Sequence, residues 1–138
     1  MNSERKSVLF ICTHNAARSQ MAEALLNKLY EDRYKAFSAG TDPTQIDPLV
    51  VSVMREIGID VSNNQSKSLD IFKDTNFDYA ITLCDQAKES CPYFSGGRSQ
   101  LHRSFPDPSA FEGKSEDVIN QYRRIRDEIK DWIEKEFC

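Results

Sequence analysis

Cys12 and Arg18 are separated by five residues and stand between an apolar run and a stretch with helical periodicity. A short loop at the start of a helix points backbone N–H groups inward, and these groups, with the helix dipole, bind tetrahedral oxyanions. The Arg18 guanidinium can bind two oxygens of the same anion, and the positive surroundings favour the thiolate form of Cys12. We therefore expect Cys12 to be a nucleophile that faces an oxyanion. The residues expected to bind this anion are Thr13, His14, Asn15, Ala16, Ala17, Arg18 and Ser19.

Taken alone, a cysteine six positions before an arginine has a simpler explanation. Cys12 could be a small buried hydrophobe at a strand end, and Arg18 a surface residue of a helix. The predicted strand before the loop and the predicted helix after it favour the catalytic interpretation.

Asp107 lies between Pro106 and Pro108, in a segment that cannot continue a regular element. Attack by Cys12 on an oxyanion must expel an oxygen, which needs a proton donor to leave as water. A carboxylic acid on this rigid loop can supply that proton. The alternative is an ordinary turn aspartate, because aspartate is common beside proline in turns.

Cys84 and Cys91 form a second possible reactive group, with six polar or small residues and no glycine between them. A disulfide requires Cα atoms about 4.4–6.8 Å apart, so a relay through several cysteines needs such a segment to change shape. Two structural thiols, or half of a metal site, are the alternatives. His14 and His102 have no partner at zinc-finger spacing, so we expect no metal and favour redox chemistry.

The elements that would position these residues alternate along the chain. Apolar runs predict strands at 7–11, 34–38 and 77–83, with a weaker candidate at 101–105. Helical periodicity predicts helices at 19–30, 47–57 and 116–135, and a short helical stretch at 68–73. This order indicates an α/β fold with an open parallel sheet of about four strands and helices on both faces. Cys12, Cys84 and Asp107 each follow a predicted strand, at the sheet edge where such folds bind ligands.

The length and composition set broad limits. The 138 residues, 39% of them apolar, fit a single domain spanning 1–138. No stretch approaches the roughly 20 apolar residues of a membrane span, and the N-terminal apolar run is too short for a signal peptide, so we expect a cytoplasmic protein. A formal charge of −4 gives no overall field that would attract nucleic acid or an acidic membrane.

Together these motifs resemble the arsenate reductases built on the low-molecular-weight protein tyrosine phosphatase fold. The resemblance extends over nearly the whole chain, and it implies that Cys12 is the nucleophile, Arg18 the oxyanion clamp and Asp107 the general acid. The segments that carry it are 12–23, 38–40, 58–60, 82–84, 91–92, 105–108 and 124–129.

The same resemblance implies reduction of arsenate to arsenite. Cys12 attacks arsenate, and Cys84 then attacks Cys12 and releases arsenite. Cys91 finally attacks Cys84, which frees Cys12 and leaves a disulfide between Cys84 and Cys91. A thioredoxin-type dithiol protein would reduce the product. Phosphate and sulfate are expected to compete for the site, no cofactor is expected in this chain, and we expect a monomer.

Two other functions remain open. A protein tyrosine phosphatase would use the same loop, but such enzymes usually follow the aspartate and proline with an aromatic residue, where this chain has Ser109 and Ala110. An oxyanion sensor would need neither a general acid nor a cysteine relay.

Lys67 is a departure from some similar reductases, which hold a potassium ion with residues that resemble Asn15, Glu23 and Ser38 and with a further acid. Lys67 stands in the place of that acid. Its ammonium could occupy the cavity and pair with Glu23. The alternative is a solvent-exposed lysine, the usual state of this residue.

Overall fold

The computed structural model describes residues 5–85 and 93–137, and its centre is the buried strand β1 (Lys6–Cys12). This strand pairs in parallel with β2 (Tyr34–Gly40) on one side and with β3 (Phe77–Thr82) on the other. A strand with neighbours on both sides and covered on both faces must be apolar throughout, which explains the continuous apolar run near the N-terminus. The predicted strands at 7–11, 34–38 and 77–83 are thus confirmed.

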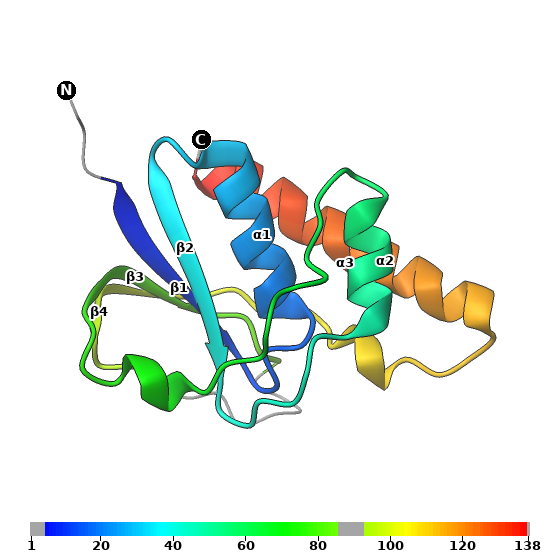
Figure 1. Ribbon diagram of the computed structural model, residues 1–138, viewed down its shortest axis with the longest axis horizontal. Helices are drawn as coiled ribbons and strands as arrows, with labels where there is room; N and C mark the ends of the chain where they lie inside the picture. The colour runs from blue at the N-terminus through cyan, green and yellow to red at the C-terminus, as the bar shows by residue number, and fades with distance from the viewer. Residues whose placement is uncertain (1–4, 86–92, 138) are drawn as a thin grey trace.

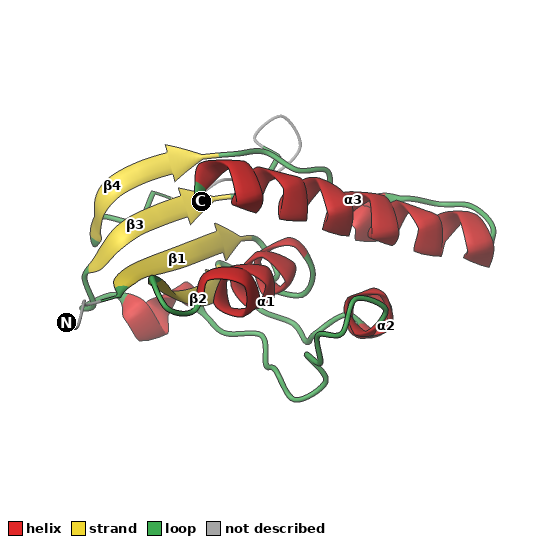
Figure 2. Ribbon diagram, turned by 90° about the horizontal axis from the view of Figure 1, so that it is seen from above, coloured by secondary structure: helices red, strands yellow, loops and turns green. Residues whose placement is uncertain are grey.

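The fourth strand, β4 (Gly97–His102), completes a parallel sheet in the order β2-β1-β3-β4 (Figure 2). The weaker prediction of a strand at 101–105 was wrong in position, because β4 ends at His102. All of β4 except Gly97 is exposed, so its sequence has neither an apolar run nor an alternating pattern. An edge strand of this kind depends on backbone pairing with β3 and leaves little signal in side-chain type.

The helices α1 (Arg18–Tyr30), α2 (Pro48–Arg55) and α3 (Ser115–Glu136) lie on one side of the sheet (Figure 1). Their apolar faces join Val8 and Phe10 of β1 in the larger of two cores. Helix α2 begins at Asp47, whose carboxylate accepts a hydrogen bond from the N–H of Leu49 (2.9 Å). It is closed soon after Arg55 by Gly58, whose φ of 82° favours glycine.

The opposite face of the sheet is covered by the short 3-10 helix η1 (Leu69–Phe72) and by aromatic side chains. The Phe72 and Phe77 rings meet edge to face with centroids 5.4 Å apart, and Phe37 and Phe94 extend the cluster. This second core buries Leu9 and Ile11, the β1 residues that alternate with Val8 and Phe10. The predicted fold class, an open parallel sheet of about four strands with helices on both faces, is confirmed, with the three α-helices on one face and η1 on the other.

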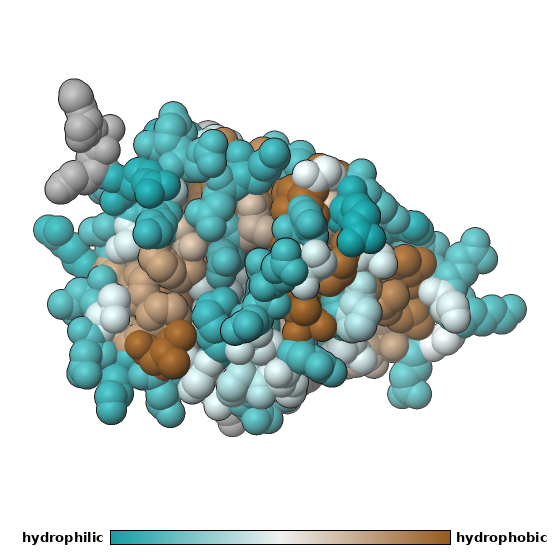
Figure 3. Space-filling view, viewed as in Figure 1, coloured by the Kyte–Doolittle hydropathy of each residue, from teal (hydrophilic) through white to brown (hydrophobic). Residues whose placement is uncertain are grey.

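The surface seen in Figure 3 is mostly hydrophilic, with apolar side chains gathered in a few places, one of them over η1. Within residues 5–85 and 93–137, no helix is long and apolar enough to cross a membrane.

Candidate active site

Cys12 is the last residue of β1, is 2% exposed and carries a free thiol. Its Sγ atom lies 2.8 Å from the hydroxyl oxygen of Ser19, in the first turn of α1. The Asn15 side-chain amide donates to the same hydroxyl oxygen at 2.7 Å. Because the hydroxyl already accepts this bond, its own hydrogen can point toward the sulfur and stabilise a thiolate.

The loop between Cys12 and Arg18 turns its carbonyl groups outward. The carbonyl oxygens of Thr13, His14 and Ala16 accept bonds from backbone N–H groups of the segment 42–47, at 2.8–3.3 Å. A planar peptide directs its N–H opposite to its carbonyl, so the N–H groups that follow these carbonyls point toward the inside of the loop. This arrangement is compatible with a cradle of backbone donors for an oxyanion, which stays a prediction.

Asn15 holds this conformation with a φ of 50°, in the left-handed region that asparagine tolerates. Its side-chain carbonyl oxygen accepts from the Lys67 N–H (2.8 Å) and from the Gln20 amide (3.0 Å). Its backbone carbonyl accepts from the Ser66 hydroxyl at 2.8 Å. The buried Asn15 therefore fixes the loop to α1 and to the segment 65–67.

Gly40, the end of β2, lies directly against the same loop. A Cβ atom at this position would stand 2.4 Å from the Thr13 carbonyl oxygen and 2.9 Å from the Asn15 nitrogen. Both neighbours are backbone atoms, which cannot move aside like a flexible side chain. The parallel register that pairs Cys12 with Gly40 therefore requires glycine here.

Arg18 is 2% exposed, and its guanidinium donates to the Phe105 carbonyl at 3.3 Å. It also lies 3.6 Å from the Asp107 carboxylate, which is three-quarters buried. The other Asp107 oxygen accepts from the Ser109 N–H (2.9 Å) and hydroxyl (2.7 Å) at the start of η2 (Pro108–Ala110). Asp107 is thus both a turn residue and a member of the pocket, so the two interpretations of this residue are compatible.

A pocket of about 20 Å³ brings the predicted nucleophile, clamp and acid together. Helix α1 begins at this pocket: its N-cap residue Ala17, whose side chain makes no capping hydrogen bond, and its first residue, Arg18, both line it. The lining residues are Cys12, His14, Ala16, Ala17, Arg18, Asp47, Asp107 and Ser109.

From the sequence, Asp47 is only the first residue of the predicted helix at 47–57, and its place in the pocket was missed. Its second oxygen accepts a 2.5 Å hydrogen bond from the hydroxyl of Tyr122, on α3. Burial, and then this bond, raise the pKa of Tyr122. A sequence shows the short-range capping bond, but the contact with Tyr122 spans 75 residues and has no local signature.

The second cysteine group is described in part. Cys84 follows β3, is fully buried and is disulfide-bonded, whereas Cys12 is free. Cys91 lies outside the described residues, so the predicted relay stays a prediction. Within the described ranges, no group of three His, Cys, Asp or Glu residues could hold a metal ion.

Lys67 is paired rather than simply exposed. Its ammonium nitrogen lies 3.7 Å from a Glu23 carboxylate oxygen and donates to the Gln65 carbonyl at 3.2 Å. The same Glu23 oxygen accepts from the Ser38 hydroxyl at 2.5 Å. The positive charge therefore lies beside the Glu23 oxygen that also binds Ser38, while the Lys67 backbone is bound to Asn15.

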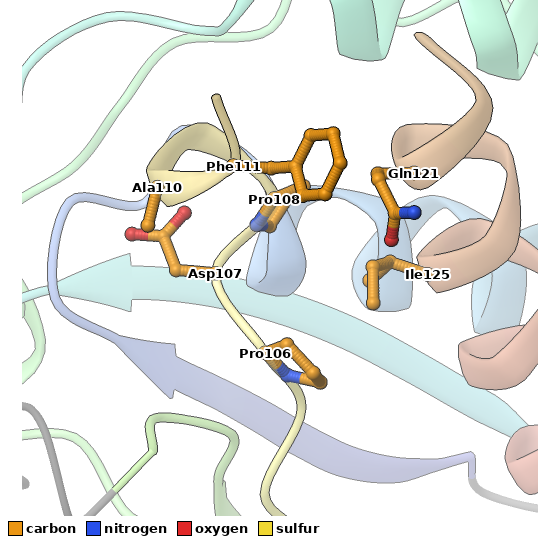
Figure 4. A pocket seen from close by; sticks show the side chains of 7 residues that line it. All are labelled: Pro106, Asp107, Pro108, Ala110, Phe111, Gln121 and Ile125. Carbon is orange, nitrogen blue, oxygen red and sulfur yellow. The ribbon is translucent and has the colours of Figure 1, made fainter. Parts of the chain in front are cut away.

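A larger hollow of about 200 Å³ lies on the far side of the segment that carries Asp107. Figure 4 shows the Asp107 carboxylate pointing away from Phe111 and Ile125, which line this hollow. Asp107 lines both this hollow and the anion pocket, whereas Cys12 and Arg18 line only the anion pocket.

The chain is similar to known proteins over nearly its whole length. The family model described as low molecular weight phosphotyrosine protein phosphatase matches residues 7–137. The arsenate reductase of Bacillus subtilis (strain 168) is 37% identical over 135 residues, which cover 98% of this chain and 96% of that protein.

Two solved structures are also similar. A structure described as an arsenate reductase in the phosphate binding state has a TM-score of 0.79 and 28% identity, and covers 94% of this chain and 95% of its own. The thioredoxin-dependent arsenate reductase of Corynebacterium glutamicum has a TM-score of 0.66 and 31% identity, and covers 98% of this chain and 63% of its own.

Proposed function

The chain belongs to the low molecular weight phosphotyrosine protein phosphatase family, and from that premise we propose that it is an arsenate reductase with Cys12 as nucleophile. The observation that carries this proposal is the free Cys12 thiol beside the Ser19 hydroxyl and the buried Arg18, in a chain so similar to an arsenate reductase. The backbone donors and Arg18 would hold the arsenate oxygens.

In the first step the Cys12 thiolate attacks arsenic and forms a sulfur–arsenic bond. Asp107 protonates the departing oxygen, which leaves as water. The 3.6 Å separation of Asp107 and Arg18 supports this role, because the acid then stands beside the oxygens that the guanidinium binds.

In the second step Cys84 attacks the Cys12 sulfur, and a disulfide forms between them. The sulfur–arsenic bond breaks, its electron pair stays on arsenic, and arsenite leaves. Two thiols have then become one disulfide while arsenic(V) has become arsenic(III). The parallel pairing of β1 with β3 supports this step, because it brings Cys12 and Cys84 to the ends of neighbouring strands.

In the last step Cys91 attacks Cys84 and frees Cys12 as a thiolate. A disulfide-bonded Cys84 beside a free Cys12 accords with the state that this step would leave. We propose thioredoxin as the reductant of that disulfide, supported by the relative described as thioredoxin-dependent. Phosphate is the expected competitor, supported by the relative described in its phosphate binding state.

The test is to mix the purified chain with arsenate, thioredoxin, thioredoxin reductase and NADPH, and to measure arsenite and NADPH. We expect one arsenite formed for each NADPH oxidised, and none without thioredoxin. Hydrolysis of para-nitrophenyl phosphate is followed in parallel. Fast hydrolysis without any arsenite would contradict the proposal in favour of a phosphatase.

A further inference from the structure

Asp47 is a carboxylate on the wall of the pocket that contains Cys12 and Arg18, and the proposed reaction does not use it. Its backbone N–H donates to the Ala16 carbonyl at 3.1 Å, which fixes its position at the rim of the anion loop. As a lining residue of this pocket, Asp47 is placed beside an anion that enters it.

The hydrogen bonds of Asp47 indicate what it can offer such an anion. One oxygen accepts from the Leu49 N–H at 2.9 Å and the other from the Tyr122 hydroxyl at 2.5 Å. Both oxygens therefore act as acceptors, and a carboxylate has about four lone-pair sites in all. The remaining sites can only accept, so a favourable contact with an oxyanion requires an O–H on the anion.

The charges around the pocket reinforce this requirement. Arg18 is the one permanently positive side chain among the eight lining residues, all of which the structure describes. The same lining contains two acidic residues, Asp47 and Asp107, and the thiol of Cys12. An anion without a proton would bring oxygen lone pairs against the Asp47 carboxylate in a small pocket, which is unfavourable.

We infer that Asp47 is a specificity-determining residue that selects protonated tetrahedral oxyanions, accepting a hydrogen bond from hydrogen arsenate or hydrogen phosphate and repelling sulfate. Sulfate has no O–H at neutral pH, although its size and shape are similar. This inference rests on the proposed function for the place where the anion binds. It makes sulfate a much weaker competitor than phosphate.

The test compares the dissociation constants of phosphate and sulfate by calorimetry at pH 7, constant ionic strength and with a reductant present. Asp47→Asn keeps a good helix cap but replaces an acceptor by an amide that can donate to sulfate. We expect the preference for phosphate to fall about tenfold or more, the range of one charge-assisted hydrogen bond. Asp47→Ser should show the same loss of preference for phosphate, because serine also caps helices but carries no charge. It replaces the first variant in the test if Asp47→Asn folds poorly.

Asp42→Asn is the matched control, because it removes one acidic charge from the same segment. The Asp42 side chain is 77% exposed and does not itself line the pocket, although its carboxylate lies 3.7 Å from the ring of the lining residue His14. We expect this variant to shift both anions alike and to leave their ratio within about twofold of the wild type, as for an exposed, screened charge. An unchanged ratio in both Asp47 variants, or an equal change in Asp42→Asn, would overturn the inference.

The binding measurement does not depend on turnover. If the Asp47 variants lose the preference for phosphate as expected but the wild-type chain makes no arsenite, the role of Asp47 stands and the proposed function is contradicted. If neither anion bound the wild-type chain, both would be overturned.

Discussion

Replacing Lys67 by methionine should destabilise the folded chain, because it removes the positive charge 3.7 Å from the Glu23 carboxylate. At an effective dielectric constant of about 20, two unit charges at this distance attract by about 4.5 kcal/mol before any desolvation cost. The Lys67 and Glu23 side chains are 28% and 18% exposed, so solvent screens the pair in part. Exposed pairs contribute about 0.2–1 kcal/mol, and breaking a buried pair costs about 3–5 kcal/mol.

We therefore expect Lys67→Met to lower the free energy of unfolding by about 1–3 kcal/mol, between these two ranges. The melting temperature should fall by about 3–6 °C for each kcal/mol in a chain of this length. Urea unfolding at pH 7 measures the first quantity and calorimetry the second. Glu23→Gln and the double variant complete a cycle that isolates the interaction between the two side chains.

Lys130→Met is the control, because Lys130 forms a 3.3 Å ion pair with Glu134 on the exposed face of α3. Loss of this ion pair should lower the free energy of unfolding by less than about 0.5 kcal/mol. Equal effects of the Lys67 and Lys130 substitutions would refute a special role for the Glu23 pair.

The tethered ammonium also predicts how the chain responds to salts. With Lys67 beside Glu23, the melting temperature should be the same in potassium and in sodium at equal ionic strength. Lys67→Asp restores an acid at this position and should recover stability in potassium more than in sodium. A wild-type melting temperature that rises sharply in potassium alone would contradict the placement of the Lys67 charge beside Glu23.

Three further substitutions test other parts of the molecule. Cys12→Ser should reduce arsenite formation at least about 1,000-fold, while calorimetry shows phosphate binding largely retained; arsenite production near the wild-type rate would exclude Cys12 as nucleophile. Cys91→Ser should permit about one turnover and then accumulate a Cys12–Cys84 disulfide, visible by mass mapping, and sustained turnover with thioredoxin would contradict the relay. Glu56→Gln should be less stable than the wild type above pH 4.5, because hydrogen bonds from Arg123 and a second arginine lower the pKa of Glu56 from 4.5 to about 2. The difference in unfolding free energy between the two proteins should shrink as the pH falls from 4.5 to about 2, and it should vanish below that pH. Urea unfolding across this range measures it, and a difference that stays constant with pH would show that the arginine bonds to Glu56 do not matter.

Much of the fold could be predicted from the sequence, because the central strands are buried on both faces and the helices on one. Strand β1 reads as an apolar run for that reason, and α3 shows its buried face through Ile125, Ile129 and Ile133. Strand β4 could not be placed from the sequence, because its residues Arg98 to His102 are exposed and only backbone pairing with β3 holds them in the sheet.

The candidate site could likewise be predicted only in part. The loop from Cys12 to Arg18 is local, so its residue types and spacing suffice to predict it. Asp47 and Tyr122 meet across 75 residues, and each has a sufficient local explanation, one as a helix cap and the other as a core residue. A residue with two roles shows only the local one in a single sequence.

Asn15 has a consequence for the kinetics of anion binding. Its hydrogen bonds to Ser19, Gln20, Ser66 and Lys67 are all made within the chain, so none must form or break when an oxyanion arrives. The loop is preorganised, and the binding free energy is not spent on ordering it. Association should therefore occur in a single phase whose rate rises linearly with anion concentration, as expected for a site that does not rearrange before it accepts its ligand.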